Sequence, residues 1–532
     1  MNCGGVNQRI KQGPSLSKTD LRTDPQRVLS CSGTPGAFHL GEQPIESIRQ
    51  RIWEALLLSL PKRPDILAIQ LGAGFVLLCV LGGIMFLVPP LQVAVSVASV
   101  LVVIYFFTRP LFALFAVFVL RGLLDLLWWI PGTIMGLNML QLFSASVFLL
   151  SSTQLFLDLK RLQTHPCFRL LLGYVTLMGI AALRADDIGG NIDSIVRYTS
   201  PIVLFFMISL YFDRQSLRRM GMLTIAAVGV IPVGVSLYYY MSGQMGVYSL
   251  HGYNRLLGGY KNLHNMALMT LFFTTMFIFW FTVVRSNFKS VVLLALTSVA
   301  LFTLYKTYIR TGLLGFGVFM IALLIMMRRY RTLAVVLAMG GIFIAINTDM
   351  QDRFGDVLLM FDTDRVALDK RKLGSGRWGI WSMSMKEYMS QSPWDLILGL
   401  GLGGQRMMTL DWVKMFHSKH ITLDPHNDLL LLLYQIGPMG VAVYLGFQWQ
   451  VVRHALIIRR DPDADRFAKL LATYGIALTA TVLVTNAVSN SFVHRTSPGW
   501  YYWCICGLVF AEYGSLMRAK GRRAAELRAV PG

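Results

Sequence analysis

The sequence predicts an all-α membrane protein with about 14 transmembrane helices and one large loop on the outer face. Hydrophobic residues make up 55% of the 532 residues, charged residues make up 14%, and the mean hydropathy is +0.54. Soluble globular chains do not have this composition. Apolar runs of roughly 17 to 25 residues, long enough to cross a hydrocarbon core of about 30 Å as helices, recur along the chain.

The first 64 residues are polar and contain no signal-peptide pattern. We expect residues 1–43 to form a disordered cytoplasmic tail. Residues 44–64 space Ile45, Ile48 and Ile52 along one helical face, which predicts an amphipathic helix on the cytoplasmic membrane surface. A simple lead into the first transmembrane helix is the alternative.

Lysine and arginine gather in every second connection, for example in "LDLKRLQTHPCFR", "DRQSLRR" and "VRSNFKS". Basic loops stay in the cytoplasm, so this alternation predicts cytoplasmic N- and C-termini. The net charge of +21 is then a topology signal and does not indicate nucleic-acid binding. The expected order is helices 1–11 in residues 65–347, a periplasmic loop in 348–427, helices 12–14 in 428–517, and a basic cytoplasmic tail in 518–532.

Two arginines on the predicted outer face, Arg310 and Arg377, are candidate site residues. Arg310 lies in "YKTYIRTGLLGFG", where one helix ends and the next begins, with Lys306 one turn before it. Arg377 opens the amphipathic pattern "GRWGIWSMSMKEYM" after a Gly-Ser-Gly turn, where a positive charge opposes the helix dipole. A guanidinium beside helix-start N–H groups suits a phosphate or diphosphate. The alternatives are snorkelling for Arg310 and an ion pair with a loop carboxylate for Arg377.

His426 lies in "DPHNDLLLLLYQIG", directly before a long apolar run. A histidine titrates near neutral pH, so His426 at the outer membrane face is a candidate general base, with Asp424 or Asp428 to orient its ring. Asn427 or Asp428 is expected to cap the following helix, and the alternative is a histidine with no chemical role. Lys261 and His264 stand in a similar pattern, "YKNLHN", and are candidate supporting residues.

The sequence predicts neither a metal site nor a cofactor. Predicted outer loops contain no cysteine, and the dense outer carboxylates that a hard cation prefers are not evident. The glycine-rich "GLGLGG" at 399–404 follows no strand, so we interpret it as a tight turn and not as a dinucleotide motif.

The stretches "GSGRWGIW", "LILGLGLGG" and "DPHNDLLLLLYQIGPMGVAVYL", preceded by "YIRTGLLGFGVFM", resemble the O-antigen ligase and polysaccharide polymerase superfamily over roughly residues 250–450. The resemblance implies a metal-independent glycosyltransferase of the bacterial inner membrane that moves a glycan from undecaprenyl diphosphate to an acceptor hydroxyl on the periplasmic face. Arg310 and Arg377 match the arginines that bind the diphosphate, and His426 matches the catalytic histidine. About 14 helices exceed the roughly 12 usual for ligases.

Polymerisation of exopolysaccharide or O-antigen repeat units is the preferred function. The acceptor is then another lipid-linked glycan. Ligation to lipid A core and transfer to a protein are the alternatives within the superfamily. A transporter of polysaccharide or lipid-linked glycan is the alternative of another class. Its pathway would need buried charges, and Arg121 and Asp125 in "FVLRGLLDLLWW" are candidates, but an intrahelical ion pair is the preferred interpretation.

Overall fold

A computed structural model describes residues 109–529 apart from 128–132, 135–136, 186–187, 244–246, 251–252, 348–350, 352–376, 404–424 and 494–495. The chain divides into two compact units, Met1–Glu54 and Ala55–Gly532, and all described residues belong to the second. The predicted tail, the amphipathic helix at 44–64, the first two predicted spans and Asp424 lie outside the described residues.

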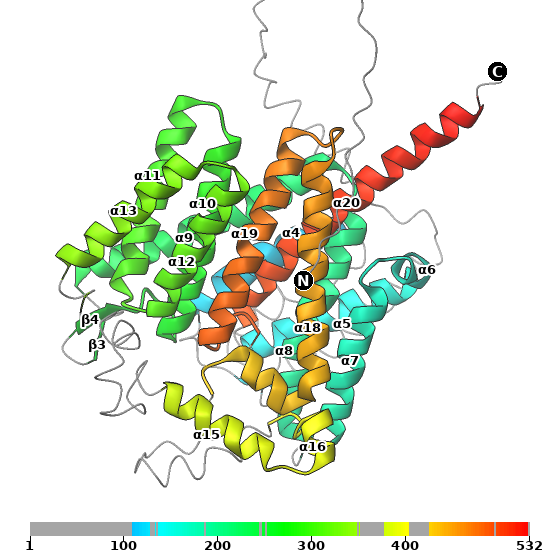
Figure 1. Ribbon diagram of the computed structural model, residues 1–532, viewed down its shortest axis with the longest axis horizontal. Helices are drawn as coiled ribbons and strands as arrows, with labels where there is room; N and C mark the ends of the chain where they lie inside the picture. The colour runs from blue at the N-terminus through cyan, green and yellow to red at the C-terminus, as the bar shows by residue number, and fades with distance from the viewer. Residues whose placement is uncertain are drawn as a thin grey trace, which may run out of the picture. The chain divides into compact units, whose positions relative to one another are not determined.

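Long helices make up most of the described chain (Figure 1). The helices before residue 348 are α4 (Pro110–Leu124), α5 (Met139–Leu157), α6 (Leu159–Gln163), α7 (Phe168–Leu183), α8 (Ile188–Tyr211), α9 (Gln215–Ser242), α10 (Leu263–Val283), α11 (Asn287–Lys306), α12 (Arg310–Met326) and α13 (Tyr330–Ile346). The later helices are α15 (Arg377–Met389), α16 (Pro393–Leu398), α18 (Asp428–Arg460), α19 (Arg466–Val488) and α20 (Thr496–Ala529).

Short irregular elements lie in the connections. A 3-10 turn, η1 (Asp125–Leu127), follows α4. Two antiparallel hairpins pair β1 (Thr133–Ile134) with β2 (Leu137–Asn138), and β3 (Val247–Leu250) with β4 (Tyr253–Leu256). These hairpins are a departure from a purely helical chain, and they satisfy backbone hydrogen bonds between helices without adding a layer to the fold.

Eight helices in the described ranges are long and apolar enough to cross a membrane, and three shorter apolar helices, α7, α12 and α13, accompany them. The polytopic α-helical class is therefore confirmed. A total of about 14 spans and a periplasmic location of the large loop stay predictions. The length of α20 differs from the prediction. The helix continues to Ala529, beyond the expected end of the last span at residue 517.

Ion pairs explain the extension of α20. Lys520 pairs with Asp461, and Arg523 Nη1 lies 2.8 Å from Asp463 Oδ2, so the connection between α18 and α19 holds the extra turns. The Lys520 ammonium, which bonds to the Asp461 carboxylate, lowers the pKa of Asp461. The residues expected to form a simple tail are thus part of the helical structure up to Ala529.

The helix bundle brings the C-terminal helices to its centre (Figure 1). α19 packs along both α12 and α18, and α20 packs along α8. A continuous buried face on α20 from Trp500 to Ala511 supplies much of the core. In Figure 1, α15 and α16 lie at one end of the bundle, beside the start of α18.

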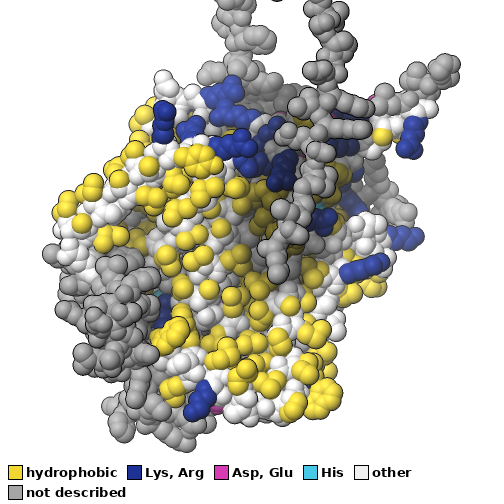
Figure 2. All heavy atoms as spheres, in the orientation of Figure 1, with side chains coloured by type: hydrophobic (Ala, Val, Ile, Leu, Met, Phe, Trp, Pro, Cys, Tyr) yellow, Lys and Arg dark blue, Asp and Glu magenta, His cyan; other side chains and the backbone are white. Residues whose placement is uncertain are grey.

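The surface separates charge from apolar side chains (Figure 2). On the face shown, most lysine and arginine side chains gather at the end opposite α15 and α16, and hydrophobic side chains cover the area between. α13 has no buried residue, although it is apolar along its length. An apolar helix with every face exposed suits a lipid environment.

Candidate functional site

The start of α15 is attached to the end of α19 by Arg377. Its Nη1 donates a hydrogen bond to the carbonyl of Val488, the last residue of α19, at 2.5 Å. The last carbonyls of a helix have no partner within the helix and carry partial negative charge. The C-terminal end of α19 therefore compensates for a positive charge in the first turn of α15. Arg377 has no ion pair with a carboxylate among the described residues.

Arg310 is the second basic group here. It is half-buried at the first position of α12. Burial, and then the positive charge of Arg310, lower the pKa of Arg377. The two guanidinium groups are therefore close enough to repel each other, although they are far apart in the sequence. Two like charges in a partly buried place are unfavourable unless an anion joins them.

His426 has a left-handed backbone, with a φ of 49°. Few residues other than glycine adopt this conformation, and the contacts on both sides must hold it. On one side, the indole N–H of Trp381 in α15 donates to the carbonyl of Pro425 at 2.9 Å. On the other side, Asn427 Nδ2 donates to the carbonyl of Ala487 at 2.7 Å. The half-buried His426 is thus fixed between α15 and α19.

The two residues after His426 have separate structural tasks. Asn427 caps α18, as predicted, because its Oδ1 accepts from the N–H of Leu430 at 3.0 Å. Asp428 is fully buried, and its Oδ2 accepts from the N–H groups of Ser491 and Val493 at 2.7 and 3.0 Å. Asp428 therefore fixes the connection between α19 and α20.

The arrangement converges at the end of α19. Asn427 and Arg377 donate to the carbonyls of Ala487 and Val488, which are consecutive residues. Consecutive Cα atoms lie about 3.8 Å apart, so the two side chains end side by side. His426 precedes Asn427 in the sequence. The positive charge of Arg310 acts on Arg377, so these two guanidinium groups are also near each other. The structure therefore gathers the three main predicted site residues in one region.

The predicted supporting residues on α10 and α11 have local roles. Lys306 Nζ lies over the rings of Tyr305, Tyr240 and Phe302, at 5.3, 5.6 and 5.8 Å from their centroids. Cation–π contacts of this kind stabilise an ammonium group in an aromatic surrounding.

Lys261 is exposed, and the adjacent Asn262 caps α10 by accepting from the N–H of His264 at 2.8 Å. The half-buried His264 therefore belongs to the first turn of α10.

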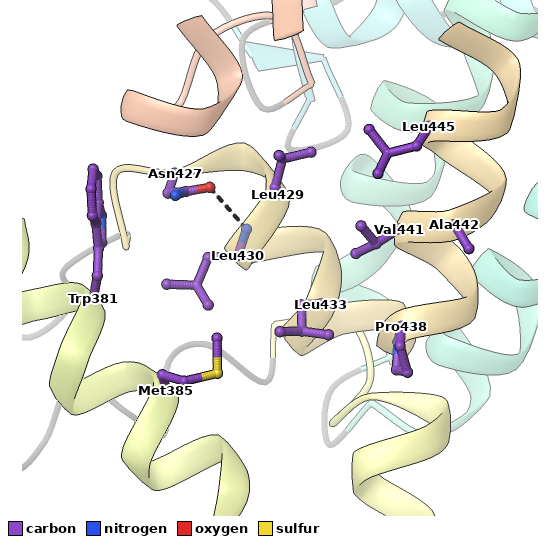
Figure 3. Close-up of a pocket in the computed structure, with 10 residues that line it drawn as sticks. All are labelled: Trp381, Met385, Asn427, Leu429, Leu430, Leu433, Pro438, Val441, Ala442 and Leu445. Atoms are coloured by element: carbon purple, nitrogen blue, oxygen red, sulfur yellow. Dashed lines mark hydrogen bonds between the residues drawn. The ribbon is translucent and has the colours of Figure 1, made fainter. Parts of the chain in front are cut away.

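An apolar groove of about 440 Å³ lies beside the site, between α15 and the first half of α18 (Figure 3). One polar side chain, Asn427, closes its upper end, and the remaining lining is apolar or aromatic. The lining residues are Trp381, Met385, Asn427, Leu429, Leu430, Leu433, Pro438, Val441, Ala442 and Leu445. In Figure 3, Trp381 and Met385 face Leu430 across the groove.

A bend in α18 gives the groove its shape. Gly437 has non-helical angles, φ 70° and ψ −178°, and Pro438 follows it. Pro438 has no N–H, so the carbonyl of Tyr434 has no hydrogen-bond donor within the helix. It accepts a hydrogen bond from the N–H of Leu400 instead, at 2.6 Å. A Cβ on Gly437 would lie 2.1 Å from the carbonyl oxygen of Ile397, so only glycine permits this approach.

The glycine-rich stretch after α16 is the turn that meets this bend. Gly399, Gly401 and Gly403 all have positive φ. Arg184 holds the turn from α7, since its Nη1 donates to the carbonyl of Gly399 and its Nη2 pairs with Asp395, both at 2.5 Å. Sequence reasoning missed this pair and the bend, although the Gly-Pro dipeptide at 437–438 is a signal for such a break.

A second buried polar cluster lies away from the site. Arg121 is 1% exposed, its Nη2 donates to Ser497 Oγ at 2.7 Å, and its guanidinium lies over the Trp500 ring at 5.1 Å. Asp125 Oδ1 is 3.8 Å from Arg121 Nη2, which is the intrahelical ion pair considered from the sequence. Both residues are buried against α20, so they do not line an open pathway.

Residues 292–445 match a family model described as O-antigen ligase. The matched segment runs from α11 into α18 and contains Arg310, Arg377 and His426. No curated protein matches the chain. The family match supports a glycan-transferring membrane enzyme and confirms that the chain is similar to the O-antigen ligase and polysaccharide polymerase superfamily.

Proposed function

We propose that the protein transfers a glycan from an undecaprenyl-diphosphate donor to an acceptor hydroxyl at the periplasmic face. The convergence of Arg377 and Asn427 on consecutive carbonyls of α19 carries this proposal. Arg377, the proposed diphosphate ligand, and Asn427, the neighbour of His426 in the sequence, donate to adjacent residues, and this supports the proposal. The family match supports glycan transfer as the class of reaction.

His426 is the proposed general base. The acceptor hydroxyl attacks the anomeric carbon of the donor glycan while the imidazole takes the hydroxyl proton. The bond between the anomeric carbon and the diphosphate oxygen breaks, and undecaprenyl diphosphate leaves with the bonding electrons. The contacts of Pro425 and Asn427 hold the backbone of His426, and so fix the point from which its side chain starts.

Arg377 and Arg310 are the proposed donor-binding residues. The leaving diphosphate gains negative charge as the bond breaks, and preformed positive groups stabilise that charge most where water is excluded. A guanidinium has five N–H groups in a fixed plane, and the hydrogen bond from Arg377 to the Val488 carbonyl uses one of them. We assign this task to Arg377 and Arg310, because both are basic groups of the same partly buried region.

The charge distribution supports the proposed orientation. Lysine and arginine gather at the end opposite α15, as cytoplasmic ends of membrane proteins do (Figure 2). We expect a reporter fused within residues 355–420 to report the periplasm, and one after Arg328 or at the C-terminus to report the cytoplasm. A cytoplasmic signal from the first fusion would remove the proposed site from the side on which the lipid-linked donor is presented.

Polymerisation of repeat units stays our first proposal for the acceptor, and ligation to lipid A core is the second because the matching family model is described as O-antigen ligase. Purified protein in liposomes, supplied with lipid-linked glycan in the presence of EDTA, tests transfer itself. Elongated lipid-linked glycan indicates a polymerase, and product formed only when lipid A core is added indicates a ligase. Absence of product with both acceptors, together with movement of the donor across the bilayer, would favour a transporter instead.

A further inference from the structure

The groove between α15 and α18 offers a ligand a mostly apolar surface. Asn427 is its one polar lining residue apart from the indole of Trp381. Both ends of the Asn427 amide are bonded within the protein, to Leu430 and Ala487, and the Trp381 N–H is bonded to Pro425. A sugar in this groove would leave its hydroxyl groups without partners, so the groove suits an apolar chain.

The upper end of the groove meets the basic site directly. Trp381 is four residues after Arg377 on α15, so the two side chains lie on the same helix face, one turn apart. Asn427 closes the same end and adjoins His426. A ligand that fills the groove and reaches this end therefore has an apolar body and a negatively charged head beside Arg377 and Arg310.

The groove continues along the surface of α18 past the bend. Its lining residues on α18 lie on both sides of the bend, with Leu429 and Leu433 before it and Val441 and Leu445 after it. Leu445 and Met385 are 40% and 41% exposed, so the groove is open along its side. This open side would let a long chain enter the groove laterally from the bilayer.

We propose that this groove binds the first isoprene units of the donor lipid, next to its diphosphate, and so sets the depth of the glycosidic bond relative to His426. This inference rests on the proposed function of the site. It commits to a polyprenyl chain over a phospholipid acyl chain because the groove opens at its polar end onto the groups assigned to the diphosphate.

Two soluble probes distinguish binding of the diphosphate head group from binding of the isoprenoid chain. Inorganic diphosphate carries the charge alone, and farnesyl diphosphate adds three isoprene units. We expect purified wild-type protein to bind farnesyl diphosphate at least about tenfold more tightly than diphosphate, because burial of only about two methylene groups accounts for a factor of ten.

Leu433→Trp fills the groove and should abolish most of this preference while the affinity for inorganic diphosphate is unchanged. Val441→Trp, further along α18, provides a second blocking variant should Leu433→Trp not fold. Met439→Trp is the matched control, since Met439 lies on the same helix, is 54% exposed and does not line the groove.

The outcomes distinguish the inference from the proposed function. If a blocking variant keeps the full preference for farnesyl diphosphate, the tail lies elsewhere and the inference is wrong. If dodecyl phosphate displaces farnesyl diphosphate at equal concentration, the groove takes bulk acyl chains, and the inference is equally wrong. If Arg377→Ala binds both probes like the wild type, the proposed head-group site fails, whatever the groove binds.

Discussion

Two partly or fully buried arginines in this protein have opposite surroundings. Arg121 lies with the Asp125 carboxylate, the Ser497 hydroxyl and the Trp500 ring, and it is 1% exposed. Arg377 is half-buried and donates a hydrogen bond to a backbone carbonyl, and the positive charge of Arg310 lowers its pKa. The first arrangement is electrically neutral within the protein, whereas the second concentrates positive charge.

This difference indicates a role in stability for Arg121 and a role in ligand binding for Arg377. A buried charge beside its counter-charge needs nothing further, and removing one partner leaves the other uncompensated. Two neighbouring positive charges repel each other, and a bound anion lowers that repulsion. We therefore expect changes at Arg121 to reduce stability, and changes around Arg377 to reduce activity while the protein stays folded.

The largest effect is expected for His426→Ala. General-base catalysis contributes about 10² to 10⁴ in rate, so glycan transfer should fall by that factor. Membrane abundance should stay near the wild-type level, because Asn427 and not His426 caps α18. Transfer by purified protein, normalised to folded protein, measures the effect. Full activity, or a loss only in proportion to lost protein, would assign His426 a structural role.

Arg121→Met is expected to destabilise the protein by about 3–5 kcal/mol, because it leaves Asp125 buried without its partner. The double variant Arg121→Met with Asp125→Leu removes both charges and should recover most of that loss. Unfolding in detergent, followed by temperature or denaturant, measures both. Equal destabilisation by the single and double variants would show that the ion pair itself is not what matters there.

Arg377→Lys should reduce the transfer activity more than about tenfold, so that lysine does not restore the activity lost in Arg377→Ala. A lysine ammonium is a point charge and cannot make the planar two-pronged contact of a guanidinium with a diphosphate. Arg310→Ala should reduce donor use by a smaller factor. Kinetics at varied donor concentration give the comparison, and near-normal activity of the lysine variant would reduce the role of Arg377 to general electrostatics.

Asn427→Ala is expected to have the smallest effect. Loss of a helix cap reduces stability by about 0.5–2 kcal/mol, and the contact with Ala487 is lost as well. The variant should melt at a lower temperature, and its transfer rate per folded molecule should fall less than that of His426→Ala. A transfer defect as large as that of His426→Ala at unchanged stability would mean that Asn427 acts on the substrate.

Sequence patterns predicted the helical class and the cap at Asn427, because apolar length and polar caps are local properties. They could not predict that Arg377 meets the end of α19, since the acceptor is the carbonyl of Val488 and any residue there has one. For the same reason, the sequence does not predict the hydrogen bond from the N–H of Leu400 to the carbonyl of Tyr434 at the bend.

Asp428 was expected to orient His426, but the backbone N–H groups of Ser491 and Val493, which leave no sequence signal, occupy one of its oxygens. Asp424 lies outside the described residues, so its proposed role at the ring stays a prediction. Long-range contacts to backbone atoms thus account for most of what the sequence did not predict about this site.

The most direct measurement is the thermal stabilisation that inorganic diphosphate gives to three purified proteins. Ligand at about 100 times its Kd stabilises a folded protein by about 2.7 kcal/mol. We expect diphosphate to raise the melting temperature of the wild type and of the Arg121→Met, Asp125→Leu double variant, and to leave that of Arg377→Ala unchanged. Equal stabilisation of Arg377→Ala and the wild type would contradict the claim that the charge at Arg377 is held for a diphosphate.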